Sequence, residues 1–300
     1  MTGFDVTSGS IYVGCQGWRY ADWRAVAPCP DATPFYRANT PATHELACYS
    51  RTFDLVEVDS TFYAVPQART LEGWAAQTPQ DFRFTLKLPR ALTHEARLRR
   101  GRGTLLEFCK RSELLGPKLA AILIQLPPSF GTDELPALER FLPHLPAGLP
   151  FAVEFRDPGW LNWRTLELLC RHQVALTLGE TPWIDTATSL PWLEHLPVDW
   201  VYVRIMGAKQ GGLERFTHLQ VNRDRELSEW AAALKQLALE GRNACVLLDN
   251  HFQGFSPGSA SLLKRKLGQP IHPFPRDSIH SGGQLGLDLD VVPSREDATM

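Results

Sequence analysis

Charged side chains stand two residues apart within short apolar stretches of this chain. Glu154 and Arg156 have this spacing, and so do Glu57 and Asp59. Residues two apart on a β-strand project from the same face, so each pair would present both groups to one site. An arginine beside a glutamate keeps the carboxylate ionised and can bind a phosphate or carboxylate in bidentate fashion. Two carboxylates can bind a metal or share acid–base work.

Both pairs also have structural explanations. Glu154 and Arg156 could form an ion pair that stiffens the end of a strand. Glu57 could be a hydrogen-bonded interior glutamate, with Asp59 as a turn residue that caps Thr61.

Two further cations fall on predicted strands. Lys87 and Arg204 could both reach a central cavity, and together with Arg156 they would suit an anionic ligand. A buried lysine could instead act as a base of lowered pKa or form a Schiff base, as lysines do in aldolase-type barrels.

Polar loops follow the last two predicted strands. The first, residues 207–212, is rich in glycine and contains Lys209, and the second contains Asn250 and His251. A helix with Ser256 as its N-cap and Pro257 as its first residue comes next. Barrels often bind phosphate between such loops, so we expect a phosphate or other anion here. The alternative is a plain glycine loop and an ordinary helix cap.

Aromatic and basic residues alternate after the first predicted strand, and arginines cluster after the third. The two groups are Trp18, Arg19, Tyr20, Trp23 and Arg24, and Arg97, Arg99, Arg100 and Arg102. Stacking aromatics and phosphate-neutralising arginines would suit a nucleic acid. A packed aromatic lid and a solvated basic loop are the structural alternative.

The sequence gives weaker evidence for a metal site or for a reactive thiol. Of nine histidines only His94 and His251 fall near predicted strand ends, where with Glu57, Glu154 and Asp249 they could hold one divalent metal. No certain cofactor is indicated. The six cysteines are scattered without a C-x-x-C pair, which favours reduced thiols over a disulfide scaffold or structural zinc.

The elements that must position these groups alternate along the chain. Eight apolar runs predict strands at 11–14, 53–58, 82–88, 120–126, 150–155, 174–178, 200–205 and 244–248. Helical segments are predicted between them at 41–52, 68–77, 104–115, 133–141, 161–172, 224–240 and 256–267, with a short apolar turn at 190–196. This alternation predicts a single-domain (β/α)8 TIM barrel, with a doubly wound sheet as the alternative. We place the barrel at 11–275, between tails at 1–10 and 276–300, the second of which we expect to be disordered.

Length and composition agree with one large α/β domain. The chain has 300 residues, of which 44% are hydrophobic, and a net charge of −2, so a polyanion would need a local basic patch. No signal-peptide pattern or membrane-length apolar run occurs, and we expect a cytoplasmic protein without a membrane partner. No feature of the sequence indicates the oligomeric state.

Seven motifs in order resemble the YecE-like family, a TIM-barrel domain of unknown function. They are GCQGWRY at 14–20, EVDSTFY at 57–63, Lys87 with Thr93 and His94, QLPPSF at 125–130, EFR at 154–156 with Trp160, YVR at 202–204, and Asn250 and His251 with Gly254. The resemblance implies a barrel and a site location, but no settled reaction. The chain departs from the family at Gln16, where a small residue is usual, and at Met206, where histidine is frequent. It also lacks the aspartate usual after the sixth strand, with Glu180 nearby.

Our leading hypothesis is a barrel whose mouth binds a phosphate-bearing ligand, either a small molecule or a nucleic acid, and hydrolyses it. Glu57 and Glu154 would be bases or metal ligands, and His94 or His251 the acid. The expected ligand-binding residues are Trp18, Tyr20, Asp59, Tyr63, Lys87, Gln125, Arg156, Trp160, Arg204, Lys209 and Asn250. A non-catalytic binding or adaptor protein and a sugar or sugar-phosphate isomerase or lyase are the alternatives.

Overall fold

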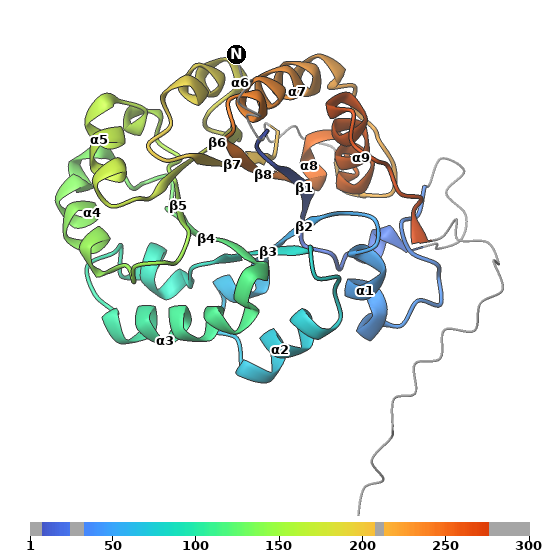
Figure 1. Ribbon diagram of the computed structural model, residues 1–300, viewed down its shortest axis with the longest axis horizontal. Helices are drawn as coiled ribbons and strands as arrows, with labels where there is room; N and C mark the ends of the chain where they lie inside the picture. Colours follow the sequence, from blue (N-terminus) through green and yellow to red (C-terminus); the bar gives the residue numbers. More distant parts are fainter. Residues whose placement is uncertain (1–7, 25–32, 208–212, 276–300) are drawn as a thin grey trace, which may run out of the picture.

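Eight parallel strands close into a barrel in which each strand pairs with the next along the chain and β8 pairs with β1 (Figure 1). A computed structural model of the chain describes residues 8–24, 33–207 and 213–275. The strands are β1 Ile11–Gln16, β2 Leu55–Val58, β3 Arg83–Lys87, β4 Leu119–Gln125, β5 Phe151–Glu154, β6 Ala175–Glu180, β7 Trp200–Ile205 and β8 Asn243–Leu248. The predicted (β/α)8 barrel is confirmed, and the doubly wound sheet is excluded because the strands close into a ring.

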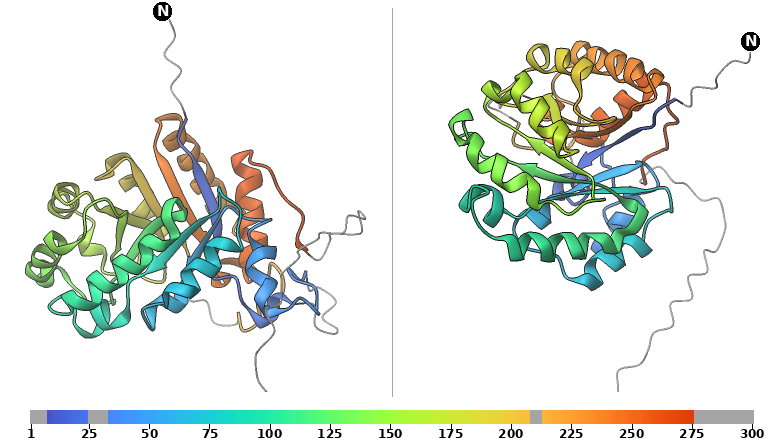
Figure 2. Two further views of the ribbon diagram at one scale, coloured as in Figure 1. Left: turned by 60° about the horizontal axis from the view of Figure 1, so that its bottom comes forward. Right: turned by 60° about the vertical axis from the view of Figure 1, so that its left-hand side comes forward.

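Helices surround the barrel and fill the connections between strands (Figures 1 and 2). They are α1 Glu45–Tyr49, α2 Ala68–Ala76, α3 Arg102–Ser112, α4 Leu135–Phe141, α5 Trp163–Arg171, α6 Thr186–Ser189, α7 Asp224–Leu239, α8 Asn250–Gln253 and α9 Ser256–Leu267. The apolar turn predicted after the sixth strand is a 3₁₀ helix, Leu190–His195. None of the helices in the described part of the chain is long and apolar enough to cross a membrane.

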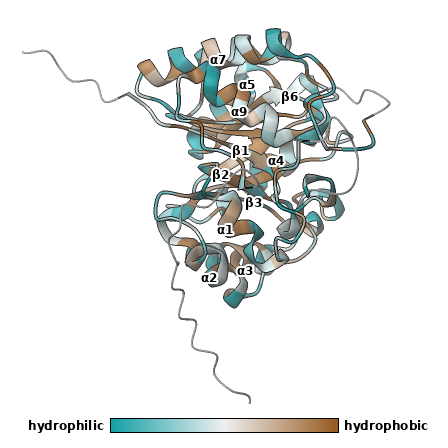
Figure 3. Ribbon diagram, turned by 90° about the vertical axis from the view of Figure 1, so that its right-hand side faces the viewer, coloured by the Kyte–Doolittle hydropathy of each residue, from teal (hydrophilic) through white to brown (hydrophobic). Residues whose placement is uncertain are grey.

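The helices pack on the strands through one apolar face each. In α7 the residues at helical spacing, Leu227, Trp230, Ala231, Leu234 and Leu237, are all buried. Figure 3 shows the hydrophobic strands at the centre and hydrophilic stretches on the helices around them. This layer between helices and strands forms the larger hydrophobic core.

A second, smaller core lies inside the barrel. Because side chains alternate along a strand, the residues that do not contact the helices point inward. This inner core consists of Leu55, Ala121, Leu123, Ala152, Ala175, Tyr202, Cys245 and Leu247. Charged and amide side chains follow it at the carboxyl ends of the same strands, where Gln16 pairs in register with Glu57 and Gln125 with Glu154.

The start of α9 differs from the prediction. Ser256 is the first helical residue and Phe255 the N-cap, so the assignment of Ser256 as the cap is wrong by one position. The backbone N and the hydroxyl of Ser256 both donate to Oδ1 of Asn250, at 2.9 Å each. A side chain from the preceding helix therefore satisfies the helix start that a cap would otherwise serve.

The amino-terminal end of the described chain contacts α7 and β8. Gly9 donates to Ala238, and Ser10 donates to the Asn243 side chain. The predicted tail at 276–300 and residues 208–212 of the glycine loop lie outside the described residues.

Candidate functional site

Arg204 occupies the centre of the carboxyl end of the barrel and is buried. Its Nε and Nη2 donate to the two oxygens of Glu57, at 3.0 and 2.7 Å. Its Nη1 donates to Glu154 and to Gln125, and its Nη2 also donates to Oε1 of Gln16, at 2.8 Å. A guanidinium has five N–H groups, so all of them are engaged. We refer to Arg204 and its four acceptors, Gln16, Glu57, Gln125 and Glu154, as the arginine network.

The arginine network changes the role predicted for Arg204. We expected Arg204 to neutralise a bound anion directly, but no N–H group remains for a ligand in this arrangement. Gln125, another predicted ligand-binding residue, is also held by Arg204. Gln16, noted above only as a departure from the family, is the fourth side chain that accepts from Arg204. Arg204 is therefore placed to hold the interior together and to position Glu57 and Glu154.

The two glutamates have opposite pKa shifts. Burial raises the pKa of Glu57, and Arg204 only partly offsets it, while the neighbouring Asp59 adds to the rise. Burial also acts to raise the pKa of Glu154, but there Arg204 and Arg156 together outweigh it, and the net shift is downward. Glu154 is therefore held as a carboxylate.

Tyr202 and Thr85 complete the interior beneath Glu57. The Tyr202 hydroxyl donates to Oε2 of Glu57 at 2.6 Å, and Thr85 Oγ1 lies 2.6 Å from the same hydroxyl. Because the tyrosine has one proton and gives it to Glu57, Thr85 is the donor of the second bond. Our sequence reasoning missed both residues, although Tyr202 stands two before Arg204 on one strand and must share its inward face.

Arg156 lies next to the arginine network, directly after β5. Its Nε donates to Oε1 of Glu154 at 3.2 Å, and its guanidinium lies over the Trp183 ring, 4.2 Å from the centroid. Its side chain is 14% exposed. The two terminal nitrogens of Arg156 make no hydrogen bond to any residue that the structure describes. They remain available to a ligand, held in place by Glu154 and by Trp183, another residue missed in the sequence.

Lys87 pairs with a carboxylate near the same mouth of the barrel. Its Nζ lies 3.1 Å from Oδ1 of Asp59 and 4.8 Å from the centroid of the Phe62 ring. The structure thus brings Lys87 and Asp59 together as an ion pair, at the end of β3 and directly after β2.

His94 lies in an electropositive setting to which Arg156 and Lys87 both contribute. Its Nδ1 is 2.9 Å from Oγ1 of Thr93, and its ring meets Phe62 edge-on. Burial, followed by the positive charges of Arg156, Lys87 and Arg90, lowers the pKa of His94 to about 4. The imidazole is therefore neutral at pH 7, and the acid role expected for His94 stays a prediction. A neutral imidazole can accept a proton instead.

The residues after β8 have mainly structural partners. Oδ1 of Asn250 accepts from Trp23 Nε1 at 3.1 Å as well as from Ser256, which ties this loop to the segment after β1. His251 is exposed, and its ring packs edge-on against Phe216. Burial raises the pKa of Asp249, whose side chain accepts from the backbone N of His251 at 2.8 Å.

The aromatic residues predicted to bind a ligand lie in different environments. Trp160 is buried, stacks on Phe155 and donates to the Phe130 carbonyl at 2.8 Å, so it belongs to the core and not to a binding surface. Trp18 packs against Trp74, and Tyr20 donates to the Gln16 carbonyl. Tyr63 is 78% exposed. Lys209 lies outside the described residues.

The arginine clusters proposed for nucleic acid are partly engaged in ion pairs within the chain. Arg97 and Arg99 both pair with Glu134, and Arg97 also lies over the Phe130 ring. Arg19 and Arg24 both pair with the buried Glu45. These contacts reduce the positive charge that either cluster presents to a polyanion.

The proposed metal ligands do not come together. Within residues 8–24, 33–207 and 213–275, no three histidine, cysteine or carboxylate side chains are grouped so that they could hold a metal ion. Glu57 and Glu154 face Arg204, whereas His251 lies at the surface. The cysteines in the same ranges, Cys15, Cys48, Cys109, Cys170 and Cys245, are free thiols.

The fold and this site define a class of protein: a (β/α)8 barrel with a buried arginine network at the carboxyl ends of its strands. The family model of the protein of unknown function DUF72 matches residues 12–279. The chain therefore belongs to the DUF72 family, whose activity is unknown, and the resemblance to the YecE-like family is confirmed.

Individual relatives agree with this assignment. The chain is 35% identical to the UPF0759 protein YecE of Escherichia coli K12 over 148 residues, which span 49% of each protein and thus about half of that relative. It is 27% identical to YunF of Bacillus subtilis 168 over 270 residues, 81% of this chain and 90% of YunF.

Solved structures of DUF72 proteins share the fold. One from Enterococcus faecalis V583 is 19% identical, with a TM-score of 0.69 over 88% of this chain and 98% of that one. One from Thermotoga maritima MSB8 is 24% identical, with a TM-score of 0.66 over 87% of this chain and 100% of that one. At these identities the likeness supports the barrel fold alone.

Proposed function

We propose that the barrel binds the anionic group of a small molecule, a phosphoryl or carboxylate group, beside Arg156, Lys87 and His94. The observation that carries this proposal is the fixed orientation of the Arg156 guanidinium and its two nitrogens that are free in the part of the chain that the structure describes. Its guanidinium is fixed by Glu154 and by the Trp183 ring, yet both of its terminal nitrogens are free within the described residues. A pre-oriented guanidinium with two free nitrogens suits bidentate binding of such an anion.

The electrostatics around His94 support an anion site. Positive charges from three side chains act on His94 in addition to burial, and they disfavour a proton on its ring. An anion bound between Arg156 and Lys87 would offset these charges. Binding would then raise the pKa of His94, which links ligand occupancy to a measurable signal.

A small anion is favoured over a polynucleotide. The net charge is −2, and two of the arginines after β3 are paired with Glu134. Extended binding to nucleic acid generally depends on a stripe of unpaired cations. Nucleic acid is therefore the less favoured ligand, and direct titration tests it.

Hydrolysis of the ligand would have to use His94 as the base. The carboxylates of Glu57 and Glu154 are both bound to Arg204, which leaves His94 better placed to accept a proton. Because Arg204 binds both glutamates, a second candidate function is a binding protein without turnover. The isomerase or lyase hypothesis would require Lys87 to leave its ion pair with Asp59.

The test is a calorimetric titration of the whole chain with inorganic phosphate, repeated with acetate as the carboxylate probe. Arg156→Met and Lys87→Met remove the cations while keeping most of the side-chain volume, and Arg164→Met, on the exposed surface of α5, is the matched control. We expect Arg156→Met to weaken phosphate binding about tenfold or more. Equal binding by wild type and Arg156→Met would refute the proposed site.

Turnover and nucleic acid are tested on the same proteins. Release of phosphate or nitrophenol from a phosphomonoester and a phosphodiester, lost in His94→Gln but not in Arg164→Met, would support hydrolysis. Binding without release would support the second candidate. Fluorescence anisotropy with labelled single- and double-stranded DNA at low and moderate salt tests the polynucleotide ligand.

A further inference from the structure

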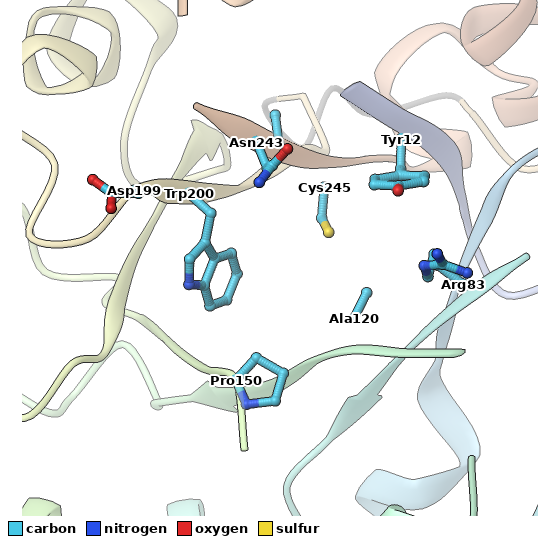
Figure 4. Close-up of a pocket in the computed structure, with 9 residues that line it drawn as sticks. Tyr12, Arg83, Ala120, Pro150, Asp199, Trp200, Asn243 and Cys245 are labelled. Atoms are coloured by element: carbon cyan, nitrogen blue, oxygen red, sulfur yellow. The ribbon is translucent and has the colours of Figure 1, made fainter. Parts of the chain in front are cut away.

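A pocket of about 290 Å³ opens at the amino end of the barrel, opposite the site described above (Figure 4). Residues at the starts of the strands line it, among them Tyr12 of β1, Arg83 of β3, Ala120 of β4, and Cys245 of β8. Trp200 of β7 lies across from Tyr12 and Arg83, with Cys245 and Ala120 between them (Figure 4). The volume is near the lower end of the range typical of small-molecule sites.

Small residues occupy inward positions of the barrel, and one of them, Cys245, lines the pocket. Ala121, Ala152, Ala175 and Cys245 belong to the inner core, where barrels usually carry bulky branched side chains. The larger side chains at this end, Tyr12 and Trp200, stand at the sides of the opening (Figure 4). The space is therefore bordered by aromatic rings and not filled by them.

A cation stands at one edge of this apolar space. The Arg83 guanidinium lies 5.4 Å from the centroid of the Tyr12 ring, and its Nη1 donates to the carbonyls of Gln80 and Phe82, at 3.3 Å each. Its Nε and Nη2 make no hydrogen bond within the described ranges of the chain. Arg83 and Cys245 both line the pocket. Burial raises the pKa of the Cys245 thiol to about 12, and the charge of Arg83 acts in the opposite direction.

We propose that this pocket binds a small aromatic carboxylate. The ring would lie over Ala120 and Cys245 between Trp200 and Tyr12, which offer faces or edges for aromatic contact. The carboxylate would accept from Nε and Nη2 of Arg83, a side-on bidentate geometry that a guanidinium favours. This site is independent of the anion site at the other end of the barrel.

The test uses the whole chain and one pair of probes, naphthalene-2-carboxylate and the uncharged naphthalene-2-carboxamide. Binding is measured by calorimetry and by saturation-transfer NMR on the probe. Arg83→Met removes the charge but keeps a long side chain over Tyr12, and Ala120→Leu places a branched side chain inside the pocket. Arg225→Met, on an exposed arginine of α7, is the control for charge, and Arg156→Met is the control for binding at the opposite end.

We expect the carboxylate to bind the wild type, and Arg83→Met to weaken that binding about tenfold, to the level of the carboxamide. Ala120→Leu should abolish the binding of both probes in this pocket. Arg225→Met should not change that binding, and Arg156→Met should remove only the binding of carboxylate at the opposite end. Thermal unfolding of each variant shows whether it folds. Absence of carboxylate binding by the wild type at millimolar concentration overturns the proposal, and so does unchanged binding in both pocket variants. Loss in Arg156→Met alone would assign the probe to the opposite end and overturn it as well.

Discussion

The two ends of the barrel interior differ in how their space is used. At the carboxyl end, Arg204 gives all its N–H groups to side chains from β1, β2, β4 and β5. At the amino end, alanines and Cys245 leave a pocket of about 290 Å³. One end is a polar network centred on a fully engaged arginine. The other is an open, mainly apolar pocket whose lining also includes Arg83, Asp199 and Asn243.

This difference follows from the different free-energy costs of an unpaired buried charge and of an unfilled apolar space. A buried charge that lacks partners destabilises the fold by several kcal/mol, so each N–H group of the buried Arg204 needs an acceptor. An open apolar pocket loses only packing contacts, which a fold can tolerate. We therefore expect the same kinds of substitution to have very different effects at the two ends.

The largest effect should come from Arg204→Met. Removing the guanidinium leaves Glu57 and Glu154 buried without their cation, and we expect the free energy of unfolding to fall by about 3–5 kcal/mol at neutral pH. Urea unfolding at pH 7 measures it. Part of the loss should return at lower pH, because protonation neutralises both carboxyl groups.

A triple variant sharpens this result. Adding Glu57→Gln and Glu154→Gln to Arg204→Met removes the uncompensated charges and should recover stability relative to Arg204→Met alone. A loss below about 1 kcal/mol in Arg204→Met would mean that water reaches the carboxylates, and the picture of a closed network would then fail.

Tyr202→Phe should have the second largest effect. The substitution removes the hydroxyl that donates to Glu57 and accepts from Thr85, leaving both with one partner fewer. We expect a loss of about 1–2 kcal/mol in the free energy of unfolding. Tyr12→Phe at the amino end is the matched control and should change it by less than about 0.5 kcal/mol. Equal losses of unfolding free energy in Tyr202→Phe and Tyr12→Phe would contradict the expected difference between the two ends of the barrel.

The pH dependence of stability tests the electropositive setting of His94. The pKa of His94 is about 4 in the folded protein, below its ordinary value of 6.5. As pH falls from 6.5 towards 4, the unfolded state takes up a proton that the folded state does not, so stability falls in this window. Because the side chain is partly exposed, we expect only about 1 kcal/mol from this residue.

His94→Gln isolates that contribution. The variant should lose less stability between pH 6.5 and pH 4 than the wild type does, while both retain the response of their other titrating groups. An NMR titration of the His94 ring with and without inorganic phosphate measures the pKa directly. A ring that titrates near 6.5 in the free protein would contradict the expected positive potential.

The smallest effect should come from Arg83→Met, which repeats the Arg204→Met substitution at the other end. Arg83 is partly exposed, and its guanidinium charge faces an open pocket instead of a buried carboxylate. We expect a change of about 0.5 kcal/mol or less in the free energy of unfolding. A loss above about 2 kcal/mol would show that Arg83 holds the amino end together, and the pocket would then have a structural role.

Much of the fold could be predicted from local sequence. All eight apolar runs are strands, and the helical segments fall between them, because strand and helix periods and turn residues act over a few neighbouring positions. The same alternation placed the two members of each charged pair on one face of a strand, and the structure shows that Glu57 and Glu154 point into the barrel, against Arg204. The error at Ser256 also has a local origin: a serine before a proline is typical of an N-cap, but Asn250 supplies the acceptor from outside the helix.

The sequence by itself thus determined the order of strands and helices and the end of the barrel at which charged groups collect. Only the tertiary structure decided which of those groups are engaged with one another. Gln16, Glu57, Gln125, Glu154 and Arg204 come from five strands, and barrel closure alone brings their side chains within hydrogen-bonding distance. For the same reason Arg204, a plausible ligand-binding arginine in the sequence, has all its N–H groups engaged, whereas Arg156 keeps two nitrogens free among the residues that the structure describes.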